Sequence, residues 1–248
     1  MDITRELKEF QNYVKNYDLT KPDIMRKFHH TFRVVEYAKD IARSEGLDDA
    51  DTRLAMLCAL LHDIARFRQW TLYDSYTDNK NFDHGDEAYN ILKYKNYISK
   101  YTTDPYEQNI ILKAVKNHNK YKIDDKLSEK EIYYTKLLRD ADKLDILVSQ
   151  NNDINGVIIL NPEYVKPFKE RRLFKNSGVT GEYEIILRQI AFVYDINFKY
   201  TYRFIKENDI ISNKIDLLIS HSSNLGIIEY IKKIVEEYID ERMKDLSN

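Results

Sequence analysis

In this chain of 248 residues, an apolar run, LAMLCALLHDIA, begins at Leu54 and includes a carboxylate, and it limits the folds that the chain can adopt. We expect it to lie in a helix from about Asp49 to Phe67, apolar on nearly every side and therefore central in the fold. His62 and Asp63 fall within this helix. Because an unpaired buried carboxylate costs several kcal/mol, Asp63 must be hydrogen-bonded, protonated or bound to a metal. The dipeptide alone leaves a buried hydrogen-bonded pair and a metal-binding pair equally open.

The rest of the sequence predicts an all-α fold, and only 6 Gly and 4 Pro interrupt it. Apolar residues at helical spacing indicate further helices, over about 4–17, 22–46, 84–94, 105–117, 129–144, 182–194, 198–206 and 225–243. Pro22 and Pro105 suit a first helical turn, and Ser128 with Glu131 forms a predicted capping box. Residues 156–160 are expected to form a short strand or an extended loop.

We expect a single domain over 1–248, with a helical core at about 22–150 and a helical extension at about 151–248. Neither a low-complexity linker nor an internal repeat divides the sequence. The apolar residues of the last helix (Ile228, Ile231, Ile234, Val235 and Tyr238) are predicted to pack on their own core or on a partner, so a homo-oligomer stays open.

Charge and cysteine content exclude several classes of function. The formal net charge is −2, so we expect no nucleic-acid polymer as a partner. The single cysteine, Cys58, rules out an intrachain disulfide and a cysteine-based zinc site, and its apolar surroundings predict a core residue. The charged N-terminus and the lack of a long apolar run predict a cytoplasmic protein that does not bind a membrane.

The histidines are placed on helices rather than scattered over the surface. The chain has six, at His29, His30, His62, His84, His118 and His221. Together with Asp63 and Asp142, four of them offer nitrogen and oxygen ligands from separate predicted helices. Neutral imidazole and carboxylate suit divalent ions such as manganese, iron, nickel or zinc. No single spacing among these residues is specific by itself.

The ordered set is more specific than its parts. It runs His30, His62-Asp63, His84, His118, Asp142, and it resembles the HD superfamily of metal-dependent phosphohydrolases. The local sequences HTFRV, LLHDIARF, DHG, NH and RDADKLD are similar to that superfamily's ligand segments. The resemblance covers roughly residues 22–150 and implies an HD-domain helical bundle. Residues 192–204 are weakly similar to an extension of some bacterial members.

Two positions depart from the superfamily's pattern. Ala65 stands where the signature often has glycine, and alanine is the better helix former. The guanosine-tetraphosphate hydrolases of the superfamily carry an acidic pair just after the His-Asp, whereas this chain continues with Ile64, Ala65 and Arg66. We therefore do not expect that activity.

The resemblance also implies the ligand sets. His30, His62, Asp63 and Asp142 would hold a first metal, and Asp63 would bridge to a second metal completed by His84 and His118. The expected cofactors are one or two divalent transition-metal ions among manganese, iron, nickel and cobalt, with magnesium as a further candidate. If only one ion binds, His84 and His118 would contact substrate or relay protons. Asp63, His84 and His118 are thus the predicted catalytic residues.

Other residues are assigned around this centre. Asp145, one helical turn after Asp142, is predicted to orient a ligand histidine, while Asp140 is predicted to be solvated or a similar acceptor. Arg66 and Lys143 are predicted to bind a substrate phosphate, with a salt bridge at the edge of the core as the alternative.

Further residues are expected to lie outside the metal chemistry. We expect His29 to be partly exposed and His221 to be structural or to face solvent. The aromatic residues Trp70, Tyr73 and Tyr76 would stack on a substrate ring or anchor their loop. The basic residues 169–175 would close over phosphates or form a solvated loop.

Three functions follow as hypotheses. The first is a phosphohydrolase, in which a metal-bound hydroxide attacks a phosphate ester or anhydride of a nucleotide or similar small molecule. The second is a mixed-valent diiron oxygenase, because a few relatives with the same six ligands have that activity. The third is a non-catalytic nucleotide-binding module, against which the six filled ligand positions argue.

Overall fold

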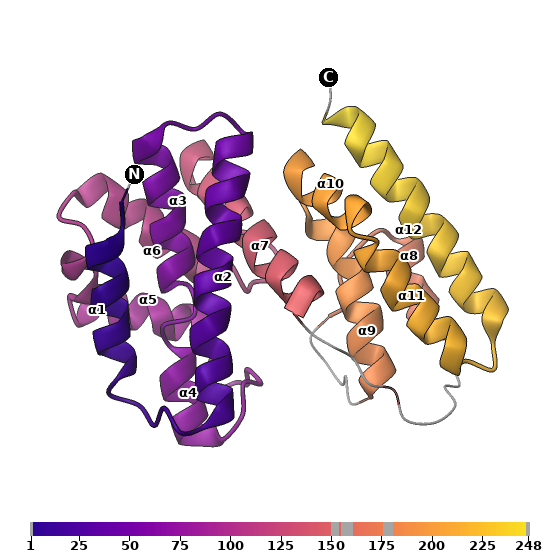
Figure 1. Cartoon of the computed structure of the whole chain (residues 1–248), viewed down its shortest axis with the longest axis horizontal. Coiled ribbons are helices and arrows are strands. Elements are labelled where there is room, and N and C mark those ends of the chain that lie inside the picture. The colour runs from indigo at the N-terminus through magenta and orange to yellow at the C-terminus, as the bar shows by residue number, and fades with distance from the viewer. Residues whose placement is uncertain (1, 150–153, 155–160, 176–180, 247–248) are drawn as a thin grey trace. The chain divides into compact units, whose positions relative to one another are not determined.

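The computed structural model describes residues 2–149, 154, 161–175 and 181–246 (Figure 1). These residues form helices joined by turns and contain no β-strand, which confirms the predicted all-α fold. The predicted strand or loop at 156–160 lies outside the described residues. The chain divides into two compact units, Met1–Asp145 and Ile146–Asn248. That the second unit is an extension of a single domain stays a prediction.

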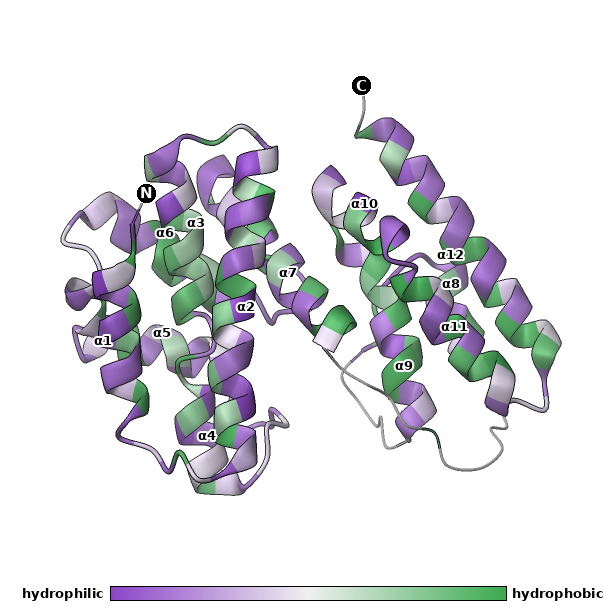
Figure 2. Ribbon diagram, viewed as in Figure 1, coloured by the Kyte–Doolittle hydropathy of each residue, from purple (hydrophilic) through white to green (hydrophobic). Residues whose placement is uncertain are grey.

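The first unit is built around one buried helix. α3 (Asp49–Leu61) packs against α1 (Thr4–Val14), α2 (Pro22–Ser44) and α6 (Pro105–Asn117). Hydrophobic residues follow one another along most of α3 (Figure 2), and every residue from Leu54 to Leu61 is buried. The remaining elements of this unit are α4 (Arg66–Tyr73), α5 (His84–Tyr94), the 3-10 turn η1 (Tyr97–Lys100) and the start of α7 (Glu129–Ser149).

The central helix is shorter than the sequence predicts. We expected one helix from Asp49 to Phe67, but α3 ends at Leu61 and α4 begins at Arg66. Between them the backbone tightens, because Ile64 N–H donates to Leu61 O and Arg66 N–H donates to Asp63 O. A run of apolar residues does not reveal such a change, since both helices bury their side chains. His62 and Asp63 therefore lie at a helix end, not inside a helix.

The helix starts follow the predicted caps. The Asp104 carboxylate accepts a hydrogen bond of 2.8 Å from Tyr106 N–H in front of Pro105. The Ser128 N–H donates to Glu131 Oε2 at 2.6 Å, and Glu131 N–H faces Ser128 Oγ at 3.4 Å, as in a capping box. Asp83, a cap that the sequence analysis did not predict, accepts a hydrogen bond of 3.0 Å from Asp86 N–H at the start of α5. These caps set where the helices next to His84, His118 and Asp142 begin.

The second unit contains more helix than predicted. Its elements are η2 (Pro162–Tyr164), α8 (Val165–Lys169), α9 (Glu182–Ile190), η3 (Ala191–Asp195), α10 (Lys199–Glu207), α11 (Ile210–His221) and α12 (Leu225–Asp245). The sequence did not reveal α8 and α11. The apolar face of α12 packs within its own unit, since Ile228, Ile231 and Val235 are buried and α12 contacts α8, α10 and α11.

His29 and His221 lie as expected, whereas the two alternatives for residues 169–175 stay predictions. Arg171, from the basic segment 169–175, forms an exposed ion pair with Glu241 at 2.8 Å. His29 is exposed, and His221 ends α11 with its ring hydrogen-bonded to Leu217 O. Among the described residues, none of the helices combines the length and the apolar character needed to cross a membrane.

Candidate metal centre

Four imidazoles from four different helical elements meet inside the first unit. His30 comes from the middle of α2, His62 directly follows α3, His84 is the first residue of α5, and His118 directly follows α6. All four are buried, with at most 5% of their surface exposed. The Nε2 atoms face one another across a small volume that also contains Asp63. The fold therefore gathers the predicted ligands even though they are far apart in the sequence.

A first cluster joins His30, His62, Asp63 and Asp142. His30 Nε2 lies 3.3 Å from His62 Nε2 and 3.2 Å from Asp142 Oδ1. Asp63 Oδ2 is 3.5 Å from His30 Nε2 and 3.4 Å from His62 Nε2. His62 Nε2 also lies 3.8 Å from Asp142 Oδ1. Two nitrogen and two oxygen ligand atoms thus surround one position, as a divalent cation requires.

A second cluster lies on the other side of the same aspartate. His84 Nε2 is 3.1 Å from His118 Nε2. Asp63 Oδ1 is 3.7 Å from His84 Nε2 and 3.8 Å from His118 Nε2. The two carboxylate oxygens of Asp63 therefore face different clusters, Oδ2 toward the first and Oδ1 toward the second. This is the arrangement that a bridging carboxylate between two ions needs.

The other ring nitrogen of each histidine is fixed by an acceptor. His30 Nδ1 lies 2.6 Å from Asp145 Oδ2, and His84 Nδ1 lies 2.5 Å from Asp78 Oδ2. In His62 and His118, Nδ1 donates to the carbonyl three residues earlier, at 2.6 and 2.7 Å. Because carboxylate and carbonyl oxygens only accept, Nδ1 carries the hydrogen in all four rings. That leaves the Nε2 lone pairs to bind a metal, so the donor set fits such a group.

The charges around the first cluster favour a cation. Burial and the nearby Lys27 both lower the pKa of His30, but hydrogen bonds to three carboxylates outweigh them and raise that pKa to about 9. These carboxylates belong to Asp142, Asp145 and Asp63. A metal ion bound by His30 would replace the proton that the ring otherwise carries.

The second cluster has the opposite electrostatic character. Burial and the positive charge of Arg66 lower the pKa of His84 to about 3, despite its hydrogen bond to Asp78. Burial likewise lowers the pKa of His118. Both rings are therefore neutral near pH 7, the form in which imidazole binds a metal.

Arg66 lies beside the centre, as expected, and it is held on several sides. Its Nε is 3.3 Å from Asp63 Oδ1, and its Nη2 is 3.2 Å from His84 Nε2. Its Nη1 donates to Gln69 Oε1 and to Tyr76 O, both at 2.6 Å. Only 13% of the side chain is exposed. The guanidinium is thus fixed in place next to the bridging carboxylate.

The remaining predicted residues lie on α7. Asp145 is fully buried and is also bound by Arg33 Nε at 2.6 Å, so Arg33 and His30 share this carboxylate. Asp140 is fully buried, which rules out the solvated alternative. Lys143 is buried as well, directly after Asp142 in the sequence. Its binding of substrate stays a prediction.

Sequence reasoning missed several residues of this centre. Asp78, from the loop after α4, holds His84 and is in turn contacted by Asn119 Nδ2 at 3.3 Å. Arg139, 2% exposed, donates to the carbonyls of residues 117, 118 and 120 and so fixes the helix end that carries His118. Lys27 binds Asp63 directly. The only signal for Lys27 is its spacing of one helical turn before His30.

Comparison with known families agrees with this geometry. The HD domain model matches residues 28–147, a range that contains all six predicted ligands. Comparison with curated proteins gave no significant match, and neither did comparison with solved structures. HD domains bind divalent metals, and the superfamily consists mostly of metal-dependent phosphohydrolases. Residues 28–147 thus form an HD domain.

Proposed function

We propose that the protein is a metal-dependent phosphohydrolase that cleaves a phosphate ester or anhydride of a nucleotide or similar small molecule. The single observation that supports this most is Asp63, whose two oxygens face separate histidine clusters. A carboxylate in that position suits a pair of ions a few ångströms apart, the arrangement common in enzymes of phosphoryl chemistry.

The residues present would divide into two ligand sets. His30, His62, Asp63 and Asp142 would hold a first ion, and Asp63 with His84 and His118 a second. When bound, divalent ions at this centre would lower the pKa of a water ligand and neutralise charge on phosphoryl oxygens. Asp145 and Asp78 would keep the histidine rings turned so that Nε2 points inward.

Arg66 would bind a phosphate group of the substrate through its positively charged guanidinium. Its guanidinium is already fixed by Gln69, Asp78 and the Tyr76 carbonyl, so little conformational entropy is lost when it contacts a phosphate. Lys143, next to the ligand Asp142, is the second residue we assign to substrate binding. Neither assignment depends on the identity of the metal.

The test is a substrate screen of protein loaded in turn with manganese, iron(II), nickel, cobalt and magnesium. Nucleoside mono-, di- and triphosphates, cyclic nucleotides and generic phosphate esters are the panel, and released inorganic phosphate or nucleotide product is measured. Asp63→Asn keeps the shape of the side chain and removes its charge, so it should abolish turnover. Asp125→Asn makes the same change in an exposed loop and should leave turnover unaltered.

Other outcomes point to the alternatives. Two bound ions per chain without any hydrolysis would overturn the proposal. A mixed-valent iron signal in electron paramagnetic resonance would then favour the diiron oxygenase. A chain that binds nucleotide but neither holds nor responds to metal would favour the non-catalytic module.

A further inference from the structure

Lys27 contacts the centre in a way that the ligand pattern does not explain. It lies on α2 one turn before His30, and its Nζ is 2.7 Å from Asp63 Oδ2, the oxygen that faces the first cluster. Only 13% of its side chain is exposed. A lysine ammonium is strongly hydrated, so holding it here requires a compensating anion.

The ring of Tyr76 forms a wall beside Lys27. The Tyr76 hydroxyl donates to Asp23 O at 2.8 Å, which fixes the ring over the first turn of α2. Lys27 Nζ lies 5.5 Å from the ring centroid, and the guanidinium carbons of Arg26 and Arg66 lie 5.2 and 5.8 Å from it. Three cations thus surround one aromatic ring at the edge of the metal centre.

The anions within reach do not balance these cations once a metal binds. Arg26 has its own partner, Asp23, at 2.8 Å. Lys27 and Arg66 both contact Asp63, the residue that also faces both histidine clusters, and Arg66 has a second carboxylate partner, Asp78, at 3.2 Å. Asp63, Asp78 and Asp142 together carry three negative charges, fewer than the positive charges of Lys27, Arg66 and even one divalent ion. An anion bound beside Lys27 would offset the remaining positive charge.

We propose that Lys27 and Arg66, walled by Tyr76, form a binding subsite for an ionised phosphoryl group of the substrate. Lys27 Nζ would leave Asp63 Oδ2 and donate to a phosphoryl oxygen. Its flexible four-carbon stem allows that movement, while the fixed Arg66 keeps its position. This inference rests on the proposed function and adds to it the residue that selects a phosphorylated substrate.

The competing explanation is that Lys27 only neutralises Asp63 in the fold. The two roles differ in what a substitution changes. A purely structural lysine would affect folding or metal content, whereas a subsite lysine would affect the affinity for phosphate in a protein that still holds its metal. The test must therefore measure phosphate binding and metal content on the same samples.

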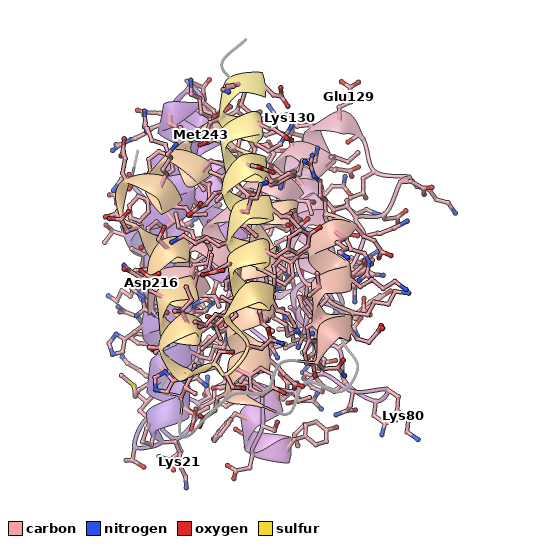
Figure 3. All side chains as sticks on the ribbon, turned by 90° about the vertical axis from the view of Figure 1, so that its right-hand side faces the viewer. Lys21, Lys80, Glu129, Lys130, Asp216 and Met243 are labelled. Atoms are coloured by element: carbon pink, nitrogen blue, oxygen red, sulfur yellow. The ribbon has the colours of Figure 1, made fainter. Side chains whose placement is uncertain are left out.

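The experiment titrates metal-loaded protein with inorganic phosphate by isothermal calorimetry. A second readout is the fluorescence of Trp70, the only tryptophan, whose ring lies 4.9 Å from that of Tyr76. The variants are Lys27→Met, which keeps the length and removes the charge, and Lys27→Arg, which keeps the charge. The control is Lys21→Met, because Lys21 at the start of the same helix extends into solvent (Figure 3).

We expect Lys27→Met to weaken phosphate binding by about 10- to 100-fold at unchanged metal content, the effect of losing a hydrogen bond to a charged group. Lys27→Arg should retain most of the affinity, and Lys21→Met should match the wild type. Equal phosphate affinity of Lys27→Met and wild type would overturn the subsite, as would a wild type that binds no phosphate. The same loss of metal in Lys27→Met and Lys27→Arg would show a structural role instead.

These outcomes are separable from those of the proposed function. Phosphate binding that depends on Lys27, in a protein that hydrolyses none of the substrates, would support the subsite while the hydrolase proposal fails. Hydrolysis with an unchanged KM in Lys27→Met would do the reverse.

Discussion

Asp145 accepts a hydrogen bond of 2.6 Å from Nδ1 of His30, although the two residues are 115 positions apart in the sequence. The aspartate is fully buried, and its other oxygen, Oδ1, accepts a hydrogen bond of 2.6 Å from Arg33 Nε. Its hydrogen bonds to His30 and Arg33 outweigh the effect of burial and lower the pKa of Asp145. Asp145 therefore stays ionised and holds the imidazole in one orientation.

Asp145→Asn is expected to weaken metal binding at the first cluster by about 10- to 100-fold, because a neutral acceptor orients and polarises the ring less well. Metal content after dialysis against a graded chelator series measures the change. Asp125→Asn, in an exposed loop, is the matched control. Unaltered metal retention in Asp145→Asn would contradict a role of this carboxylate in the centre.

Asp78→Asn should act on the other cluster. Asp78 Oδ2 lies 2.5 Å from His84 Nδ1, and no other described carboxylate is that close to this ring. We expect loss of one of two bound ions per chain, while the ion held with His30 remains. Metal stoichiometry of Asp78→Asn, Asp145→Asn and the double variant tests this. Loss of both ions in either single variant would show that the clusters do not bind independently.

Gly85→Ala tests how tightly α5 approaches the loop after α6. An added Cβ would lie 2.3 Å from Asn119 Oδ1 and 3.0 Å from Lys116 O, so Asn119 must move away from Asp83 and Asp78. We expect a loss of about 1–3 kcal/mol in the free energy of unfolding, measured with urea, and weaker metal binding next to His84.

The control for that substitution is Gly226→Ala in the first turn of α12, where nothing lies within 4 Å of the added Cβ. Alanine is the better helix former, so stability should stay the same or rise by up to about 1 kcal/mol. Similar losses in both variants would mean that backbone freedom, not the contact with Asn119, sets the cost at Gly85.

Much of the fold could be predicted because its signals are local. Pro105 after Asp104 and the Ser128–Glu131 capping box are short patterns, and the helices begin where these patterns place them. The break after Leu61 could not be predicted, because α3 and α4 are both apolar and a tight turn of four residues leaves the pattern intact. No helix was predicted over residues 210–221, where the structure has α11.

In the site, too, some residues could be predicted from the sequence and others could not. The ligand order was readable because the ordered set of histidines and aspartates resembles the ligand segments of the HD superfamily. Lys27 and Asp78 were not, since a lysine on an amphipathic helix and an aspartate in a polar loop are ordinary residues. Only tertiary packing shows that their charged ends point to Asp63 and to His84.

Lys214 provides a prediction for the second unit. It is 7% exposed, its Nζ donates to Gln189 Oε1 at 2.7 Å, and burial lowers its pKa to about 8. Between pH 8 and the ordinary lysine value near 10.5, the unfolded chain binds a proton that the folded chain does not. The contribution of Lys214 to stability should therefore become more favourable as pH rises through this range.

The measurement compares urea unfolding midpoints of wild type and Lys214→Met at pH 7 and pH 10. The difference should shift in favour of the wild type at the higher pH. Lys233→Met, at a side chain that is 70% exposed, should show no such shift. A difference that does not change with pH would mean that the pKa of Lys214 is the same in the folded and the unfolded chain.

The position of Cys58 has a practical consequence for all of these measurements. It is the only thiol of the chain, it is fully buried in α3, and burial raises the pKa of that thiol. The same helix leads directly into His62 and Asp63. A thiol reagent can therefore label the chain only after the first unit opens. The labelling rate, measured with and without divalent ions, therefore reports how much those ions slow the opening of the helices around Cys58.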